Sequence, residues 1–238
     1  MVQTDILRNG YKILQDTERF QFGIDAVLLA DFAGKSVKAG EKVIDLGTGT
    51  GIIPLLMVKK CETASYTGLE VQKESADMAA RSVAMNGLEG TIRITHGDLR
   101  EVAGLFDQHS FNVVTCNPPY MIDAHGKGNE LDAKTIARHE VLCNLEDVAA
   151  AADYLLAPHG RFFMIHRPFR LPEIFESLAA HKLEPKRMRL IHPFADKEPN
   201  MVMIEARKNA KRRLTIEPPL VVRYDNGDYT AEINRINN

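Results

Sequence analysis

The segment Asn117-Pro118-Pro119-Tyr120 contains the residues of this chain whose types and spacing have the clearest chemical meaning. Both prolines fix φ and lack an N–H, so they end the apolar run at 111–116 and form a stiff loop. The Asn117 side-chain oxygen and the Pro118 carbonyl oxygen would accept the two N–H bonds of a conjugated amine, and Tyr120 would stack on its ring. The nitrogen lone pair would then attack an electrophile without a strong base. The same dipeptides also occur in ordinary β-turns, so residues upstream decide between these interpretations.

A second informative segment is Gly47-Thr48-Gly49-Thr50-Gly51, which follows the apolar run at 42–46. Glycines after a strand let a ligand lie against bare backbone, close to the N-terminus of the next helix. The third glycine comes one residue too early for the dinucleotide fingerprint G-x-G-x-x-G. Asp45, just before the glycines, would repel a pyrophosphate and would suit an ammonium group.

Four polar residues, Asp45, Glu70, Asp98 and Asn117, recur at about the spacing of one strand and one helix. Each acidic residue alone reads equally as a turn residue, and for Asp98 a turn cap is a direct alternative to a contact with an adenine amine. Glu70 is placed to accept hydrogen bonds from a ribose. Together the four predict a crevice for a cationic amino-acid nucleoside beside an activated amine, which describes S-adenosylmethionine.

The elements that must position these residues alternate between strand and helix. We expect a hairpin at 6–15 around Asn9-Gly10. Strands are predicted at 42–46, 66–71, 91–96, 111–116 and 161–166, with a turn at Pro158-His159-Gly160 before the last, and an antiparallel pair at 186–192 and 201–207. Helices are predicted at 24–32, 52–60, 73–86, 99–106, 145–156 and 171–181. This order predicts an α/β fold, a doubly wound, mainly parallel Rossmann-like sheet with an antiparallel strand pair at one edge.

The length of 238 residues and the 45 % hydrophobic content predict one domain with a substantial core. Within it, 1–40 would be an amino-terminal hairpin and helix that close over the cofactor, 41–207 the Rossmann-like core, and 208–238 a basic extension. No apolar run is long enough to span a membrane, and no secretory segment begins the chain. The expectation is a cytoplasmic protein with no membrane partner, a monomer by preference.

Cysteines and histidines give no metal pattern. Cys61, Cys116 and Cys143 are widely spaced, which favours reduced thiols over disulfides or a zinc site, and Cys116 reads as the small apolar end of a strand. The eight histidines lack metal-ligand spacing, so no metal is expected. Several methionines read as core residues: Met85, Met121, Met164, Met188, Met201 and Met203.

The net charge is only −2, but it is unevenly distributed. Residues 1–156 carry 15 basic against 22 acidic side chains, and residues 157–238 carry 15 against 10. The basic residues gather at 167–170, 182–189 and 207–213, a distribution that indicates either a polyanion docked on one face or solvated surface loops.

Taken together, the segments Asp45 to Gly51, Glu70, Asp98 and Asn117-Pro118-Pro119-Tyr120 resemble class I S-adenosylmethionine-dependent amino methyltransferases. Further segments, at 20–30, 138–140, 218–224 and 229–232, are similar to the bacterial family that methylates N6 of adenine in valine tRNA, at the adenosine immediately 3′ of the anticodon. The resemblance extends over nearly the whole chain. It implies a tRNA partner and a catalytic role for all four residues of the Asn-Pro-Pro-Tyr motif.

The resemblance also implies a set of cofactor-binding residues. Glycines 47, 49 and 51 would approach the methionine part, Glu70 the ribose, and Asp98 with Leu99 the adenine. The full implied set is Phe22, Asp45, Gly47, Thr48, Gly49, Gly51, Glu70, Val71, Asp98, Leu99 and Asn117. The segment 19–25 would close over the cofactor, although Gly23 stands where many relatives carry a small hydroxyl residue.

The substrate side is less defined. Arg138 and His139 follow the motif and would contact RNA phosphate, or would simply be surface charge on a helix. Arg212 and Arg213 would grip phosphates from the basic extension.

Alternatives to tRNA methylation remain open from the sequence. A protein glutamine methyltransferase carries the same motif, but usually with a helical amino-terminal domain. A methyltransferase for another RNA or DNA uses the same chemistry. A nicotinamide-dependent oxidoreductase is disfavoured by the early third glycine and by Asp45, and a non-catalytic adaptor is disfavoured by the intact motif.

Overall fold

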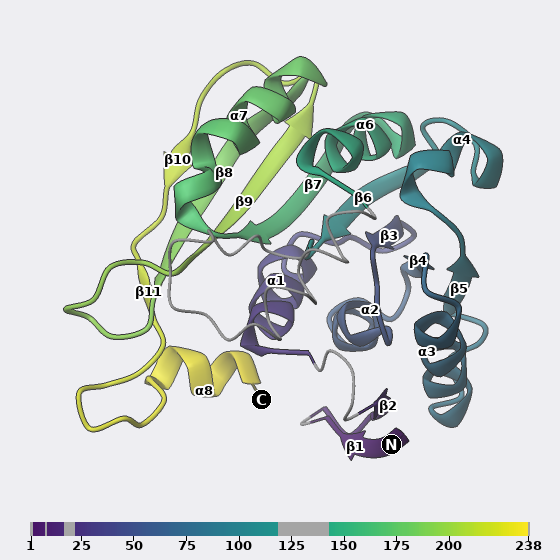
Figure 1. Cartoon of the computed structure of the whole chain (residues 1–238), viewed down its shortest axis with the longest axis horizontal. Coiled ribbons are helices and arrows are strands. Elements are labelled where there is room, and N and C mark those ends of the chain that lie inside the picture. Colours follow the sequence, from purple (N-terminus) through teal and green to yellow (C-terminus); the bar gives the residue numbers. More distant parts are fainter. Residues whose placement is uncertain (1, 8, 17–21, 119–142, 238) are drawn as a thin grey trace, which may run out of the picture.

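The computed structural model describes residues 2–7, 9–16, 22–118 and 143–237. Within them, nine strands form one sheet in the order β10-β8-β9-β7-β6-β3-β4-β5, with β11 also paired to β8 (Figure 1). The strands are β3 Lys42–Leu46, β4 Ser65–Glu70, β5 Ile92–His96, β6 Phe111–Cys116, β7 Leu156–His166, β8 Leu183–His192, β9 Met201–Lys208, β10 Thr215–Ile216 and β11 Leu220–Val221. The five strands from β7 to β5 are mutually parallel, and β9 runs antiparallel to both β7 and β8. The predicted fold class is confirmed.

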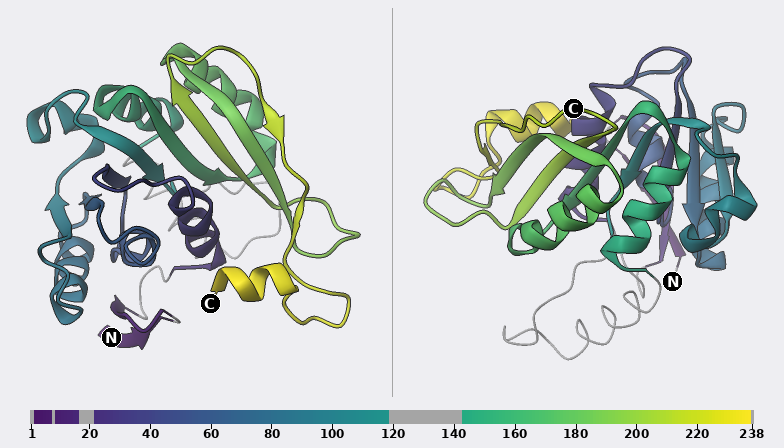
Figure 2. Two further views of the ribbon diagram at one scale, coloured as in Figure 1. Left: turned by 180° about the vertical axis from the view of Figure 1, so that it is seen from behind. Right: turned by 90° about the horizontal axis from the view of Figure 1, so that it is seen from above.

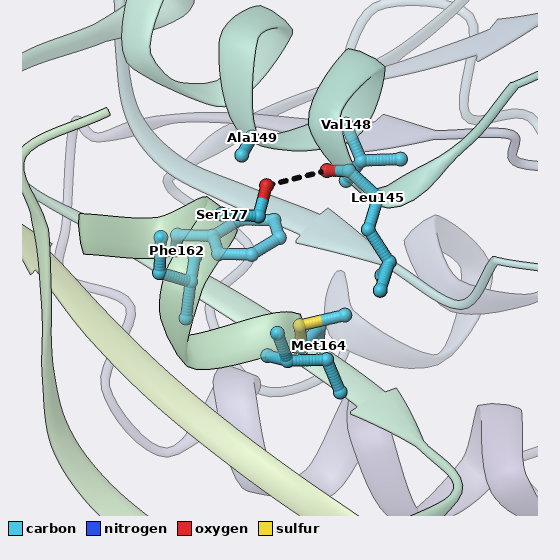
Figure 3. Close-up of a pocket in the computed structure, with 8 residues that line it drawn as sticks. Leu145, Val148, Ala149, Phe162, Met164 and Ser177 are labelled. Atoms are coloured by element: carbon cyan, nitrogen blue, oxygen red, sulfur yellow. Dashed lines mark hydrogen bonds between the residues drawn. The ribbon is translucent and has the colours of Figure 1, made fainter. Parts of the chain in front are cut away.

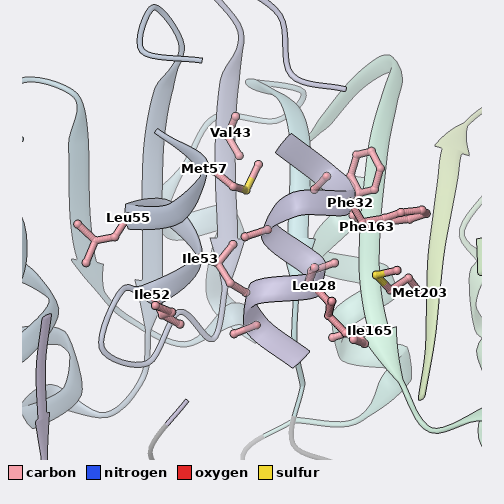
Figure 4. Close-up of a cluster of buried hydrophobic side chains, with 14 of the residues drawn as sticks. Leu28, Phe32, Val43, Ile52, Ile53, Leu55, Met57, Phe163, Ile165 and Met203 are labelled. Carbon is pink, nitrogen blue, oxygen red and sulfur yellow. The ribbon is translucent and has the colours of Figure 1, made fainter. Parts of the chain in front are cut away.

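Helices cover both faces of the sheet, as Figure 2 shows. They are α1 Ile24–Gly34, α2 Ile52–Met57, α3 Lys73–Met85, α4 Val102–Leu105, α6 Leu145–Leu155, α7 Leu171–Ala180 and α8 Ala231–Asn237, with short 3-10 turns η1 Leu99–Glu101 and η2 Pro168–Arg170. One apolar cluster packs α1 and α2 on one face, and a second packs α6 and α7 on the other. In the first, the Phe32 ring of α1 packs edge to face on the Phe163 ring of β7, with the ring centroids 5.9 Å apart (Figure 4).

The predicted amino-terminal hairpin is present as β1 Val2–Ile6 and β2 Lys12–Asp16. Its turn requires Gly10, which has a φ of 85° that other residues rarely adopt. Two polar contacts dock the hairpin on α3: Leu14 N donates to Ser82 Oγ at 2.9 Å, and Asn86 bonds both the N–H and the C=O of Lys12. The hairpin is therefore held to the helix that follows the second core strand.

Several sequence expectations were wrong in detail. The turn expected at Pro158-His159-Gly160 lies within β7, where pairing with β6 skips from Leu156 to Arg161 and His159 takes a φ of 62°. The pairing register shifts there, with residues 157–160 of β7 opposite Asn112 alone, so the turn-forming residues occupy an irregular part of a continuous strand. Met85 is 43 % exposed, because it ends α3 on the side facing away from the sheet. Helix α2 ends at Met57 rather than at residue 60.

The carboxyl-terminal segment is part of the packed structure. Strands β10 and β11 lie parallel to β8, and α8 packs on α1 with Ile233 fully buried. The Arg189 guanidinium of β8 bonds both carboxylate oxygens of Glu232 in α8, at 2.8 and 2.9 Å. The basic extension is thus fixed to the sheet at β8.

Candidate active site

The four strand-end residues lie at the carboxyl ends of four neighbouring strands, on the strand or within two residues after it. The sheet order β6-β3-β4-β5 brings together the carboxyl ends at Cys116, Leu46, Glu70 and His96, and the pairing is in step, with Leu46 opposite Cys116 and Glu70 opposite His96. Asp45 stands one residue before the end of β3, whereas Asp98 and Asn117 follow β5 and β6 by two residues and one. In open parallel sheets this edge is where ligands bind.

The glycine loop after β3 adopts a left-handed backbone conformation that favours glycine. Gly47 and Gly49 have φ angles of 68° and 57°, and a Cβ built on either would meet no atom within 4 Å. Backbone N–H groups of Gly47 and Thr48 both donate to the Leu69 carbonyl, at 2.9 and 3.0 Å, which holds the loop over the end of β4. The loop therefore leaves open space above bare backbone.

Glu70 fixes the other side of this loop. It is only 5 % exposed, and its two carboxylate oxygens accept the backbone N–H groups of Gly49 and Gln72, each at 2.8 Å. Each oxygen keeps a further lone pair for a ligand hydroxyl. The carboxylate thus orders the glycine loop in addition to any contact with a ribose.

Asp45 is buried beneath the loop and incompletely hydrogen-bonded. The Thr115 hydroxyl of β6 donates to Asp45 Oδ1 at 2.6 Å, while Asp45 Oδ2 and the Thr48 hydroxyl oxygen have no hydrogen-bond partner among the described residues. Burial raises the pKa of this carboxyl from the usual 3.8 to about 7, against the lowering effects of the Thr115 hydrogen bond and of the neighbouring Thr48 hydroxyl. A buried carboxylate oxygen without a partner in that part of the chain is suited to receive a cationic group of a ligand.

Asp98 caps the turn η1, which is the alternative to an adenine contact that the sequence left open. Its carboxylate accepts Arg100 N at 2.9 Å at the start of η1 and pairs with the Arg100 guanidinium at 2.5–3.1 Å. The hydrogen bond from the Arg100 side chain holds the pKa of Asp98 below its ordinary value. Leu99, next to it, is buried in the cluster below α6.

Asn117 is held by a residue from the amino-terminal helix. Its amide Nδ2 donates to Asp25 Oδ2 at 3.2 Å, a contact between residues 92 positions apart. Asp25 lies in the first turn of α1 and is 9 % exposed. Pro118 is buried, and Pro119 and Tyr120 lie outside the described residues.

Sequence reasoning missed the role of Asp25 and of Thr115. An acidic residue in the first turn of a helix is expected from the helix dipole alone, and a threonine inside an apolar strand is expected from β-propensity. Nothing in their local pattern signals the contacts with Asn117 and Asp45, which arise only when separate elements pack together.

The remaining predicted residues divide into three groups. Phe22 packs at the edge of the α1 cluster and its N–H donates to Gln15 of the hairpin at 3.2 Å, while the Val71 carbonyl oxygen lies 3.1 Å from His96 Nε2. Arg138 and His139, like Met121 and residues 19–21, lie outside the described residues. Arg212 and Arg213 are exposed between β9 and β10, away from the edge that carries Asn117.

Cysteine chemistry is not supported at the site. Cys116 is 1 % exposed, and burial raises the pKa of its thiol well above the usual range. Burial likewise raises the pKa of Cys143 to about 11. Both thiols are therefore poor nucleophiles, in agreement with the structural role expected for Cys116.

A separate small cavity lies between α6, α7 and β7, lined mainly by apolar side chains (Figure 3). It measures about 10 Å³, close to the space of one water molecule. Ser177 donates its hydroxyl proton to the Leu145 carbonyl, at 3.1 Å. The cavity is a packing defect and is too small for a cofactor.

No group of three or more His, Cys, Asp or Glu side chains suited to a metal ion occurs in the ranges given above. Among the helices seen in those ranges, none combines the length and the apolar character needed to cross a membrane.

Known proteins with similar sequences carry a shared name. A protein of Porphyromonas gingivalis named tRNA1(Val) (adenine(37)-N6)-methyltransferase is 28 % identical over 221 residues, covering 90 % of this chain and 86 % of the relative. One of the same name from Phocaeicola vulgatus is 26 % identical, covering 82 % and 80 %.

Solved structures share the fold. A predicted O-methyltransferase of Agrobacterium tumefaciens superposes with a TM-score of 0.73 at 23 % identity, covering 90 % of this chain and 95 % of that one. A geranyl diphosphate C-methyltransferase of Streptomyces coelicolor, solved with S-adenosyl-L-homocysteine, superposes with a TM-score of 0.58 at 15 % identity, covering 78 % and 75 %.

A family model described as "Methyltransferase small domain" matches residues 23–170, the stretch from the cap of α1 through the glycine loop and Asn117 to the end of η2. The chain is a methyltransferase of the methyltransferase small domain family.

Proposed function

We propose that this protein transfers a methyl group from S-adenosylmethionine to the N6 amine of an adenine in tRNA, at the adenosine beside the anticodon of a valine tRNA. The observation that carries the proposal is the placement of Asn117, one residue beyond β6 and beside the glycine loop, with its amide nitrogen engaged by Asp25. The names of the relatives supply the tRNA and the position in it, adenine 37.

Two features of the site support the cofactor. The open space above Gly47 and Gly49, which a Cβ would enter, fits a ligand lying against backbone. The buried Asp45 Oδ2 lacks a hydrogen-bond partner within the described ranges, and an ammonium group would provide one. We propose that these residues, together with Gly51, hold the methionine part and that Glu70 and Asp98, with Phe22, Val71 and Leu99 around them, hold the nucleoside. Bound there, S-adenosylmethionine supplies an electrophilic methyl group.

The residues of the chain act on the amine. An adenine amine has its lone pair delocalised into the ring, so it is a weak nucleophile. In the proposed arrangement the Asn117 Oδ1 and the Pro118 carbonyl accept its two N–H bonds, which favours a tetrahedral nitrogen with an available lone pair. Tyr120 would stack on the base, a contact worth about 1–3 kcal/mol in nucleic-acid binders.

The RNA must present its base outside the stack. A loop nucleotide is extruded at lower cost than a paired one, which suits an anticodon-loop adenosine. Arg138 and His139 are proposed to contact phosphate close to the base, and Arg212 and Arg213 to contact it farther away.

The test replaces Asn117 by Ala. We expect methyl transfer to tRNA to fall by at least about 100-fold, as when a single transition-state hydrogen-bonding group is removed, with cofactor affinity nearly intact. Asn112→Ala is the matched control, because Asn112 lies in the same strand but binds Lys42 N at the opposite end of the sheet. Full activity of the Asn117 variant would refute the acceptor role.

The substrate class is tested with the wild-type protein. After reaction with unmethylated RNA and with the protein fraction of a deletion strain, N6-methyladenosine in tRNA supports the proposal. Methylglutamine in protein would instead assign the enzyme to the glutamine methyltransferases.

A further inference from the structure

The contact between Asp25 and Asn117 joins two parts of the molecule that are far apart in sequence. Asp25 belongs to the first turn of α1, and Asn117 follows β6 at the ligand edge of the sheet. Asp25 is 9 % exposed, so the hydrogen bond at 3.2 Å is largely shielded from water. A shielded hydrogen bond to a charged group contributes more than an exposed one.

The chemistry of the two side chains fixes which way the Asn117 amide faces. A carboxylate only accepts hydrogen bonds, whereas an amide has a donating nitrogen at one end and an accepting oxygen at the other. With Nδ2 directed at Asp25, the amide oxygen Oδ1 faces away from that carboxylate. If the amide were rotated by half a turn, Oδ1 would face the carboxylate and the donating end would face an incoming amine, which also donates.

Gly23 makes room for this arrangement. It caps α1 with a φ of −101° and a ψ of −175°, a conformation open to any residue. A Cβ built on Gly23 would lie 2.7 Å from Asp25 Oδ1, closer than real Cβ contacts. A side chain at position 23 would therefore displace the carboxylate without straining the backbone. The glycine at this position, where a small hydroxyl residue was expected, is thus compatible with the Asp25 carboxylate as it stands.

We infer that Asp25 is a positioning residue for methyl transfer: it orients the Asn117 amide so that the oxygen, and not the nitrogen, meets the substrate amine. The inference rests on the proposed function in one respect only, namely that the substrate is an amine held by Asn117.

The first experiment compares Asp25→Ala, Asp25→Asn and the control Asp31→Asn. Asp31 lies on the same helix, is also buried, and pairs with Lys35 and Lys60. We expect Asp25→Ala to lower kcat on tRNA by about 10- to 100-fold, the equivalent of one hydrogen bond to a charged group, with cofactor affinity unchanged. Asp25→Asn, which keeps an accepting oxygen, restores most of kcat, and Asp31→Asn affects thermal stability but not kcat. Equal losses of kcat in the three variants, or a normal kcat in Asp25→Ala, would overturn the inference.

A second variant reaches the same carboxylate from another residue. We expect Gly23→Ala to lower kcat because the new Cβ displaces Asp25 Oδ1. In an Asp25→Ala background the same change should have no further effect, since the group it displaces is gone. Additive losses in the double variant would show that Gly23 acts independently of Asp25 and would count against the inference.

A measurement without substrate separates this inference from the proposed function. The side-chain amide protons of Asn117 can be assigned by NMR as the pair of signals that disappears in Asn117→Ala. We expect them to be protected from solvent exchange in the wild type and in Asp31→Asn, and to lose that protection in Asp25→Ala. Unchanged protection in Asp25→Ala would overturn the inference. Lost protection in a protein that methylates no tRNA would retain the contact and reject only the substrate.

Discussion

The carboxyl group of Asp45 shows how a residue suited to bind a ligand can destabilise the folded protein while no ligand is bound. It is 2 % exposed, and one of its oxygens has no hydrogen-bond partner in the described part of the chain. Such a group is destabilising in its charged form until a cation pairs with it. Binding of a ligand with an ammonium group would therefore offset this destabilisation.

The raised pKa of Asp45 predicts a pH dependence of stability. In the unfolded chain the carboxyl loses its proton near pH 3.8. In the folded protein it loses its proton at about pH 7. Between these values the folded protein holds one more proton, so the contribution of Asp45 to stability decreases as the pH rises. An asparagine side chain in its place would resemble the protonated acid. We therefore expect Asp45→Asn to gain stability relative to wild type, on the order of a few kcal/mol, between about pH 5 and about pH 8 in urea unfolding.

Asp98→Asn is the control for that measurement. Because the pKa of Asp98 is lowered by Arg100, Asp98 is charged in both folded and unfolded protein over that pH interval. The difference in the free energy of unfolding between Asp98→Asn and wild type should be the same at about pH 5 and about pH 8. A constant difference for Asp45→Asn as well would show that Asp45 is not a neutral acid in the folded protein.

At the scale of elements, local sequence patterns predict the bounds of a strand correctly where glycine or proline residues mark its end. Strands β3 and β6 have the bounds expected from the sequence, because glycines end the first apolar run and prolines the second. Helix α2 ends at Met57, before the expected residue 60. The residues expected as a turn lie within β7, because Leu156 pairs with Phe111 of β6 and extends the strand ahead of them. The Asp45–Thr115 and Asp25–Asn117 contacts could not be predicted, since no periodicity relates side chains on separate elements.

The docking of the amino-terminal hairpin gives a prediction at the same scale. Asn86, at the end of α3, bonds both backbone polar groups of Lys12, at 2.7 and 2.8 Å. We expect Asn86→Ala to release the hairpin locally, with amide exchange in β2 faster by roughly 10-fold while the core sheet is unaffected. Hydrogen exchange with mass spectrometry measures this, and Asn226→Ala, in a surface turn, is the control. Unchanged exchange in β2 would mean that the other contacts of the hairpin, among them the Ser82 hydrogen bond and the buried Ile13, hold it without Asn86.

At the scale of the whole molecule, the sheet separates the basic residues into two regions. Arg167 and Arg170 follow β7, which is parallel to β6, so they lie at the same edge of the sheet as Asn117. Strand β9 runs the other way and ends at Lys208, opposite Leu183 at the start of β8. Arg212 and Arg213 come after that end, on the segment that returns along β8 as β10 (Figure 1). The charge asymmetry seen in the sequence therefore spans both ends of the sheet.

This separation predicts distinct effects of charge reversal. If Arg212 and Arg213 contact tRNA phosphate far from the reacting base, replacing both by Glu should weaken tRNA binding but leave kcat at saturating tRNA unchanged. The slope of log affinity against log salt should become shallower by about 1.5, as expected for two lost phosphate contacts. The control reverses two exposed arginines at the other side of the sheet, Arg81 of α3 and Arg93 of β5. Equal tRNA affinity in the Arg212/Arg213 variant and wild type at low salt would exclude these residues from the docking surface. An equal loss of tRNA affinity in the control variant would show that the effect depends on net charge alone.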